Sequence, residues 1–266
     1  MTAIENPLIG AAPMEVPLSN APLVQVIAQV RFPLIASLGN RDFIAPIQEA
    51  IRSEYPILRP DQSQSVIFGE KGPLDARTNT AWRFHDANGE WRVTLASDFL
   101  ALQTSRYSSR DDFLDRFRRV LESFVDHVDP GVMDRLGVRY VDRITGENLK
   151  DLPALVRPEV SGVLSTPLAS QALHSISQTV FTLPDDPGQV MTRWGRIPAG
   201  GTVDPGAVDP IDESSWMLDI DAYDAVTRKF DVASILKQAQ VFSERIYNIF
   251  RWAVTDEFLR RYGGKP

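Results

Sequence analysis

Apolar residues along the chain recur at the two periods that mark strands and helices. Residues 23–32 are rich in β-branched side chains and predict a first strand. Asn40 or Asp42 can cap a helix that ends before Pro56. Its predicted apolar face consists of Ile44, Ile47, Ile51 and Tyr55. Short strands are then predicted at 65–69, 80–85, 91–95 and 99–105, with an Asn-Gly hairpin turn within 86–90.

A longer helix closes this first series of elements. Ser109 is a good N-cap, and acidic residues in the first turn favour the helix dipole. Apolar residues three or four positions apart predict its buried face: Phe113, Phe117, Leu121, Phe124 and Val128. Pro130 and Gly131 end the helix.

The same order of elements then starts again. Strands are predicted at 132–144, 172–183 and 189–197, with a short proline-interrupted helix at 152–164 after the first of them. Residues 198–212 are rich in Gly, Pro and Asp and predict a long solvent-exposed loop.

Residues 216–221 predict a half-buried strand, because apolar side chains alternate with Asp219 and Asp221. Both carboxylates then lie on one face, and their α-carbons are about 7 Å apart. Such a pair could hold Mg²⁺ or act as acid and base. Since no further acidic partner is evident, the pattern favours a solvated face.

The last predicted element is the longest helix, from about Val232 to Tyr262, with Asp231 as N-cap and Gly263-Gly264 at its end. At 1.5 Å per residue it is roughly 45 Å long. We expect it to span both halves of the chain or to reach a partner.

The repeated order predicts an α+β fold made of two similar halves by tandem duplication. Each half is a twisted antiparallel sheet with helices on one face, and it resembles the repeat of the TATA-binding-protein fold. The expected organisation is a proline-rich arm at 1–22, a first half at 23–130, and a second half at 131–266 with the long C-terminal helix.

Three stretches of sequence resemble a sporadically distributed, uncharacterised bacterial family of about this length. They are Ser19–Leu23 leading into Arg31-Phe32, Gly137–Ile144, and Asp219-Ile220-Asp221 before a helix with Ile249-Phe250 and Val254-Thr255. The resemblance covers nearly the whole chain and brings no established catalytic residues. The family's patchy distribution implies accessory genes, on mobile or defence islands.

Composition narrows the possible environments of the 266-residue chain. It is 43% hydrophobic and 24% charged, which is ordinary for a globular protein. The absence of cysteine excludes disulfides, thiolate zinc sites and a cysteine nucleophile, and it suits a reducing cytoplasm. The N-terminus lacks the pattern of a signal peptide, and no apolar run is long enough for a membrane span.

The formal net charge of −7 disfavours binding to the phosphate backbone of nucleic acids. Tryptophans interleaved with arginines, as in Trp82-Arg83 and Trp91-Arg92, are compatible with base stacking on a sheet. However, strand alternation places each tryptophan and its neighbouring arginine on opposite faces.

Five polar residues are candidates for ligand binding. Arg31, Arg139 and Arg143 occur in strands that otherwise form a core, so each must pair with a carboxylate or anchor an anionic ligand. Tyr140 and His174 could line the same cleft between the halves. No catalytic, metal-binding or phosphate-loop motif is present, so the sequence predicts no catalytic residue, metal or cofactor.

Two functions remain open. The favoured one is a non-enzymatic binding protein that holds a protein partner with its sheet, arm and terminal helix, and a homodimer through that helix is one version of it. If so, removing residues 1–22 and 255–266 should abolish capture of a partner in a pull-down while leaving the fold intact. The alternative is a small-molecule or nucleotide-binding or -processing protein with its pocket between the halves.

Overall fold

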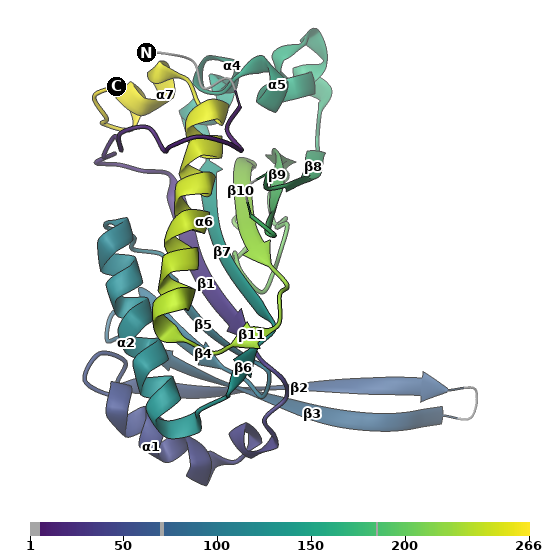
Figure 1. Cartoon of the computed structure of the whole chain (residues 1–266). Helices are drawn as coiled ribbons and strands as arrows, with labels where there is room; N and C mark the ends of the chain where they lie inside the picture. The colour runs from purple at the N-terminus through teal and green to yellow at the C-terminus, as the bar shows by residue number, and fades with distance from the viewer. Residues whose placement is uncertain (1–5, 70–71, 185) are drawn as a thin grey trace. The chain divides into compact units, whose positions relative to one another are not determined.

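The computed structural model describes residues 6–69, 72–184 and 186–266, and the side chains of these residues except those of 62–79. The fold is α+β, with a large antiparallel sheet and several helices (Figure 1). The chain forms two compact units. Unit A consists of Met1–Val26, Val138–Asp224 and Gln240–Pro266, and unit B consists of Ile27–Gly137 and Ala225–Ala239.

Unit B follows the order predicted for the first half. Its elements are β1 (Leu23–Arg31, which begins in unit A), the 3-10 helix η1 (Ala36–Gly39), α1 (Arg41–Ile51), β2 (Ile57–Gly69), β3 (Gly72–His85), β4 (Trp91–Leu95), β5 (Phe99–Thr104) and α2 (Arg110–Val128). A short pair, β6 (Val132–Met133) and β11 (Arg228–Lys229), lies in the same unit. The strand order is β2-β3-β4-β5-β1.

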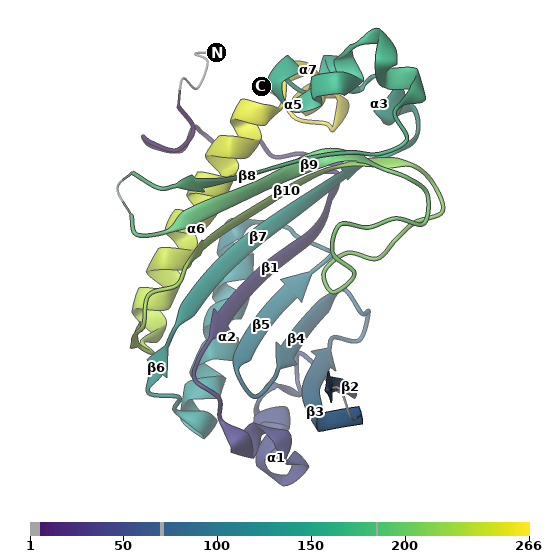
Figure 2. The same ribbon diagram turned by 90° about the vertical axis from the view of Figure 1, so that its right-hand side faces the viewer.

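The predicted helix caps are confirmed. Asn40 accepts a hydrogen bond from the Asp42 backbone N–H, and Ser109 accepts one from the Asp112 backbone N–H. The apolar face of α2 is buried as expected, except that Val128 is only half-buried. Figure 2 shows α2 behind β1, β4 and β5, so this helix covers one face of the sheet of unit B.

Strands β2 and β3 are longer than the pattern predicts. Pro60 lies within β2, which is the end strand of the order, where a missing N–H is tolerated. The Asn-Gly hairpin joins β3 to β4 as predicted, with Gly89 at a φ of +72°.

Unit A contains the second series of elements. They are β7 (Arg135–Ile144, from Val138 on), α3 (Gly146–Lys150), α4 (Leu152–Leu155), α5 (Pro158–Ser161), η2 (Gly162–Ser165), η3 (Pro167–Gln171), β8 (Ser175–Thr182), β9 (Gln189–Ile197), β10 (Ser215–Asp224), α6 (Val232–Ala253, from Gln240 on) and α7 (Asp256–Arg261). The strand order is β7-β10-β9-β8. Both views place α6 along one face of β7 and β10 (Figures 1 and 2), where Phe242, Ile246 and Ile249 are buried.

The prediction of one helix from Val232 to Tyr262 is wrong. The helical ladder stops at Val254, which forms a β-bridge with Val156. Thr255 then caps α7, because its hydroxyl accepts from the Phe258 backbone N–H and donates to the Ala154 carbonyl. With 22 residues, α6 is about 33 Å long.

The described part of the proline-rich arm, residues 6–22, contains no helix or strand, but it is packed in place. The Tyr247 hydroxyl accepts from the Val16 backbone N–H and donates to the Met14 carbonyl. Gly263, at a φ of +81°, lies so close to Ser19 that a Cβ there would overlap the Ser19 hydroxyl. The arm therefore packs against the surface of unit A, and none of its described residues is fully buried.

None of the described helices is both long enough and apolar enough to cross a membrane.

Candidate functional site

Four charged side chains form a network on one face of the unit A strands. Asp219 on β10 accepts from Arg139 Nε and Nη2 at 2.8 and 2.9 Å, and from Arg193 Nη2 at 2.6 Å. Arg139 Nη1 also donates to Asp204 at 2.6 Å. Arg193 is directly opposite Asp219 in the β9–β10 register, so neighbouring strands bring the pair together.

Loop 198–214, between β9 and β10, covers this network. Val208 of the loop is buried against Val141, Ile197 and Met217, while Asp204 of the loop reaches Arg139. The loop itself was predicted correctly, but the expectation that all of it is solvent-exposed is wrong at Val208.

The predicted solvated position of Asp219 is wrong, since its side chain is 0% exposed. Alternation along β10 assigned it correctly to the face opposite Leu218 and Ile220. That face is buried too, because the loop folds over it. Asp221, further along the strand, is half-buried.

The charges of the network cancel, because it contains two guanidinium groups and two carboxylates. Burial by itself lowers the pKa of Arg139, but the hydrogen bonds and charges of Asp219 and Asp204 raise it above its ordinary value. Partial burial acts to raise the pKa of Asp204, and Arg139 nevertheless holds it below its usual range. Arg139 is thus paired with carboxylates of its own chain, the first of the two roles that its position allows.

The remaining sequence candidates are Arg31, Arg143, Tyr140 and His174. Arg31, in unit B, is partly exposed and pairs with Asp98. Arg143 shares the face of Arg139 by alternation and donates to the Asp209 carbonyl of the loop, and burial lowers its pKa. Tyr140 points to the opposite face of β7 by the same alternation, and His174 is exposed just before β8.

Asp142 is a buried carboxyl that the sequence patterns do not single out. Burial raises its pKa to about 7. Tyr262 is close enough that, after its own burial, the charge of Asp142 contributes to raising the pKa of the Tyr262 phenol. The signal that could have found it is alternation, which places Asp142 on the β7 face that also carries Val138 and Ile144, both fully buried.

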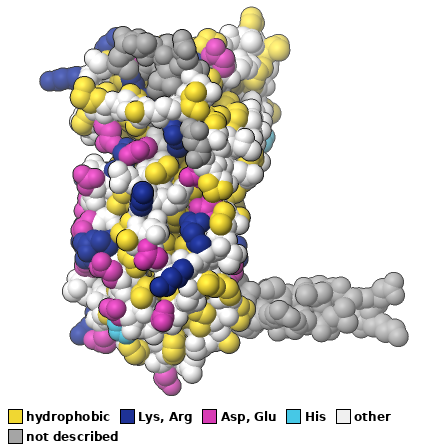
Figure 3. Space-filling view, in the orientation of Figure 1, with side chains coloured by type: hydrophobic (Ala, Val, Ile, Leu, Met, Phe, Trp, Pro, Cys, Tyr) yellow, Lys and Arg dark blue, Asp and Glu magenta, His cyan; other side chains and the backbone are white. Residues whose placement is uncertain are grey.

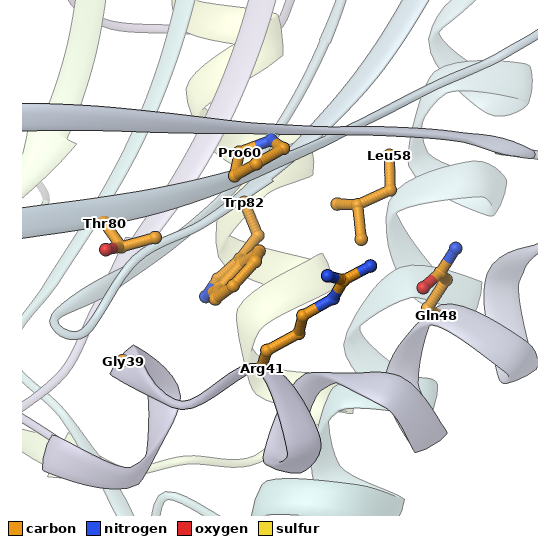
Figure 4. A pocket seen from close by; sticks show the side chains of 7 residues that line it. All are labelled: Gly39, Arg41, Gln48, Leu58, Pro60, Thr80 and Trp82. Atoms are coloured by element: carbon orange, nitrogen blue, oxygen red, sulfur yellow. The ribbon is translucent and has the colours of Figure 1, made fainter.

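A hollow of about 570 Å³ lies in unit B between α1 and strands β2 and β3 (Figure 4). Trp82 forms part of its wall, and its indole N–H donates to the Leu38 carbonyl at 2.7 Å. Figure 4 shows the Arg41 guanidinium pointing into the hollow towards Leu58. Among the described residues, no hydrogen bond or ion pair of the Arg41 side chain is found. The lining residues are Gly39, Arg41, Gln48, Leu58, Pro60, Thr80 and Trp82.

Strand β8 is exposed along most of its length. It is the end strand of the unit A order and pairs, among the described residues, with β9 alone (Figure 2). Ile176 and Val180 are 37% and 48% exposed. Its sequence, Ser-Ile-Ser-Gln-Thr-Val-Phe-Thr, contains no charge and no proline. The open edge of β8 thus lacks the usual protection against pairing with another chain.

Strand β8 is held close to β9 by Gly195. This residue has a φ of +152°, and a Cβ on it would overlap the Ser175 carbonyl of β8. A side chain at position 195 would force the two strands apart, so glycine is needed to keep the exposed strand in register.

The opposite signs of charge are mixed on the surface of unit B around α2 (Figure 3). Arg119 pairs with Glu54, Arg116 with Asp112, and Arg118 with Glu122. Such partly exposed pairs stabilise little, but they neutralise the arginines of this helix.

No protein-family model matches this sequence, and no curated protein is similar enough to count as a relative.

Proposed function

We propose that this chain is a non-enzymatic binding protein that receives an extended strand of a protein partner at the open edge of β8. The observation that carries the proposal is the eight-residue end strand without charge or proline, exposed along most of its length. An added strand would hydrogen bond to the free backbone edge, and Ile176 and Val180 would supply apolar contacts.

The other end strand, β2, supports this assignment by contrast. Arg59, Pro60 and Asp61 are consecutive in β2, and charge and proline are the features that discourage strand addition. The β2 edge is protected against pairing with another strand and the β8 edge is not, which is consistent with a binding role for β8.

A labelled peptide tests whether the open edge of β8 can bind an extended strand. Fluorescence anisotropy with a fluorescein-labelled peptide of residues 172–184 should show saturable binding, and Val180→Lys should weaken it at least tenfold, because a lysine on an edge strand blocks pairing. Leu34→Lys, at a residue 71% exposed in unit B, is the matched control and should bind as the wild type does. Absence of saturation, or equal binding by Val180→Lys, would refute the proposal.

The finer description of the fold is also a proposal. We propose that the units derive from a tandem duplication of a repeat like that of the TATA-binding protein. In support, the first strand of each series neighbours the last strand of its meander, β1 beside β5 and β7 beside β10, and a long helix follows each meander. If the Cα traces of the two series superpose no better than unrelated sheets, the duplication is refuted.

We further propose a cytoplasmic location and a gene on an accessory or defence island. The absence of cysteine supports the first, and the family resemblance supports the second. Sequencing the neighbouring genes would test the island assignment.

A second candidate function is binding of a small anionic molecule in the hollow beside Arg41. A thermal-shift screen with phosphate, citrate and adenosine monophosphate tests it. A ligand at 100 times its Kd should add about 2.7 kcal/mol of stability, and Arg41→Ala should abolish the gain. A gain that persists in Arg41→Ala would place the ligand elsewhere.

A further inference from the structure

We infer that the strand received by β8 is β8 of a second copy of this chain, related by a two-fold axis that passes through Gln178. The inference rests on the proposed function, because it names the occupant of the same edge. It differs from a homodimer through the C-terminal helix, which uses another surface.

The faces of β8 are set by its register with β9. Gln178 is opposite Arg193, and Arg193 is opposite Asp219, so these three residues share a face of the strands. Ile176 and Val180 lie two residues before and after Gln178 and therefore project from that same face. An incoming strand would meet an aliphatic side chain, a neutral amide and a second aliphatic side chain, in that order.

This order is self-complementary. A two-fold axis normal to a sheet pairs strands antiparallel and keeps every side chain on its own face, so the axis must pass through a residue pair. Centred on Gln178, the symmetry places Ile176 of each copy opposite Val180 of the other. The two exposed aliphatic side chains of the strand thus cover each other twice, and such cross-strand pairs are the stabilising unit of a sheet.

Electrostatics permits this pairing despite the net charge of −7. Residues 172–184 contain no Asp, Glu, Lys or Arg, so no like charges meet across the axis. A partner of opposite charge would find nothing to recognise on this strand, whereas a second uncharged strand fits it.

The residues before β8 extend the apolar surface. Leu168 and Leu173 are 64% and 82% exposed, and Val163 is 38% exposed. Half of the exposed large apolar side chains among the described residues therefore lie within 163–180. Concentration of exposed apolar side chains in one segment is typical of a protein–protein interface.

Sedimentation equilibrium of the full chain tests the inference. The wild type and the Leu34→Lys control should reach twice the chain mass of 29.7 kDa, and Val180→Lys should raise the dimer Kd at least tenfold. A wild type that stays monomeric up to high micromolar concentration refutes the homodimer. If the 172–184 peptide nevertheless binds and Val180→Lys weakens that binding, the edge accepts an extended strand and the proposed function stands, but the full chain does not pair with itself and the strand must come from another protein. A dimer that Val180→Lys leaves intact must use another surface, which also refutes the inference.

Disulfide trapping tests the position of the axis, and the lack of natural cysteines makes the product unambiguous. Opposed residues in an antiparallel pair have Cα atoms about 4.5–5.5 Å apart, within reach of a disulfide. Gln178→Cys should therefore cross-link two copies on mild oxidation. Thr182→Cys, on the same face of the same strand, should not, because its two copies would lie roughly 26 Å apart. Equal cross-linking of both variants would refute the register.

Discussion

Individual buried charges in unit A depend on partners that lie far away in the sequence. Asp219 has no exposed surface and neutralises two guanidinium groups, Arg139 and Arg193, that are themselves nearly buried. Asp204 contributes to the same network from the loop, but its side chain is 37% exposed. Loss of Asp219 would therefore leave a buried gap in the network, whereas loss of Asp204 would leave a position that water can reach.

Asp219→Ala should lower the free energy of unfolding by about 3–5 kcal/mol, because it leaves the nearly buried Arg193 without its carboxylate and Arg139 with Asp204 alone. Asp204→Ala should cost about 1 kcal/mol or less, since water can replace the exposed carboxylate. Urea denaturation of both variants measures the difference. Equal losses would contradict the assignment of Asp219 as the centre of the network.

Asp142 should make stability depend on pH in an unusual direction. Its pKa in the folded state, about 7, lies above the ordinary 3.8, so folding favours the protonated form. The contribution is fully present below the ordinary pKa and is lost as pH rises through about 7. Between pH 5 and pH 8, the wild type should therefore lose about 1–3 kcal/mol relative to Asp142→Asn. Denaturant titrations at both pH values measure this loss, and parallel pH profiles of the two proteins would contradict it.

Among the elements, the β2–β3 hairpin is unusual because most of it has no third strand. β3 pairs with β4 only from Trp82 to His85, whereas β2 and β3 pair with each other from Ile57–His85 to Gly69–Gly72. Within the part of the chain that the structure describes, the residue pairs of this hairpin beyond Trp82 do not pair with any third strand.

Replacing residues 64–78 by an Asn-Gly turn should therefore leave the rest of unit B folded. The expected change in Tm is within about 4 °C, which corresponds to roughly 1 kcal/mol for a chain of this size. Differential scanning calorimetry measures it. A fall of more than about 10 °C would show that the outer hairpin stabilises the sheet.

At the scale of the whole molecule, the compact units are not continuous stretches of sequence. Unit A takes Met1–Val26 from the start of the chain, and unit B takes Ala225–Ala239 from beyond the midpoint. Among the described residues, the hydrogen bonds that hold the N-terminal arm include those of Gly10, whose carbonyl accepts from Arg245, and of Asn20, whose backbone N–H donates to the Tyr262 carbonyl.

Truncation of the arm should distinguish a packed segment from a free one. Removal of residues 1–19 should lower the free energy of unfolding by about 2–4 kcal/mol, since several hydrogen bonds of roughly 1 kcal/mol each are lost together with packing. Removal of residues 1–9 leaves the contacts from Gly10 onward and should change it little. Chemical denaturation compares the two. Equal stability of both truncated proteins would contradict the packing of the arm, and would favour the expectation that the ends can be removed with the fold intact.

Much of the secondary structure was predictable because it depends on neighbours within about four residues. The caps at Asn40 and Ser109, the Asn-Gly hairpin and the buried face of α2 follow from such local relations. The break in the last helix at Val254 could not be predicted from such local relations. A β-bridge to Val156 ends the helix there, and Val156 lies almost a hundred residues earlier in the chain.

The sites divide in the same way. By itself, the sequence determined the element order, the strand faces and the two possible roles of Arg139. Tertiary structure alone decided that a loop buries Asp219, that Arg41 borders a hollow and that β8 ends a row of strands with its edge open. The physical reason is that periodicity assigns a side chain to a face, whereas burial and pairing depend on which distant segment covers that face.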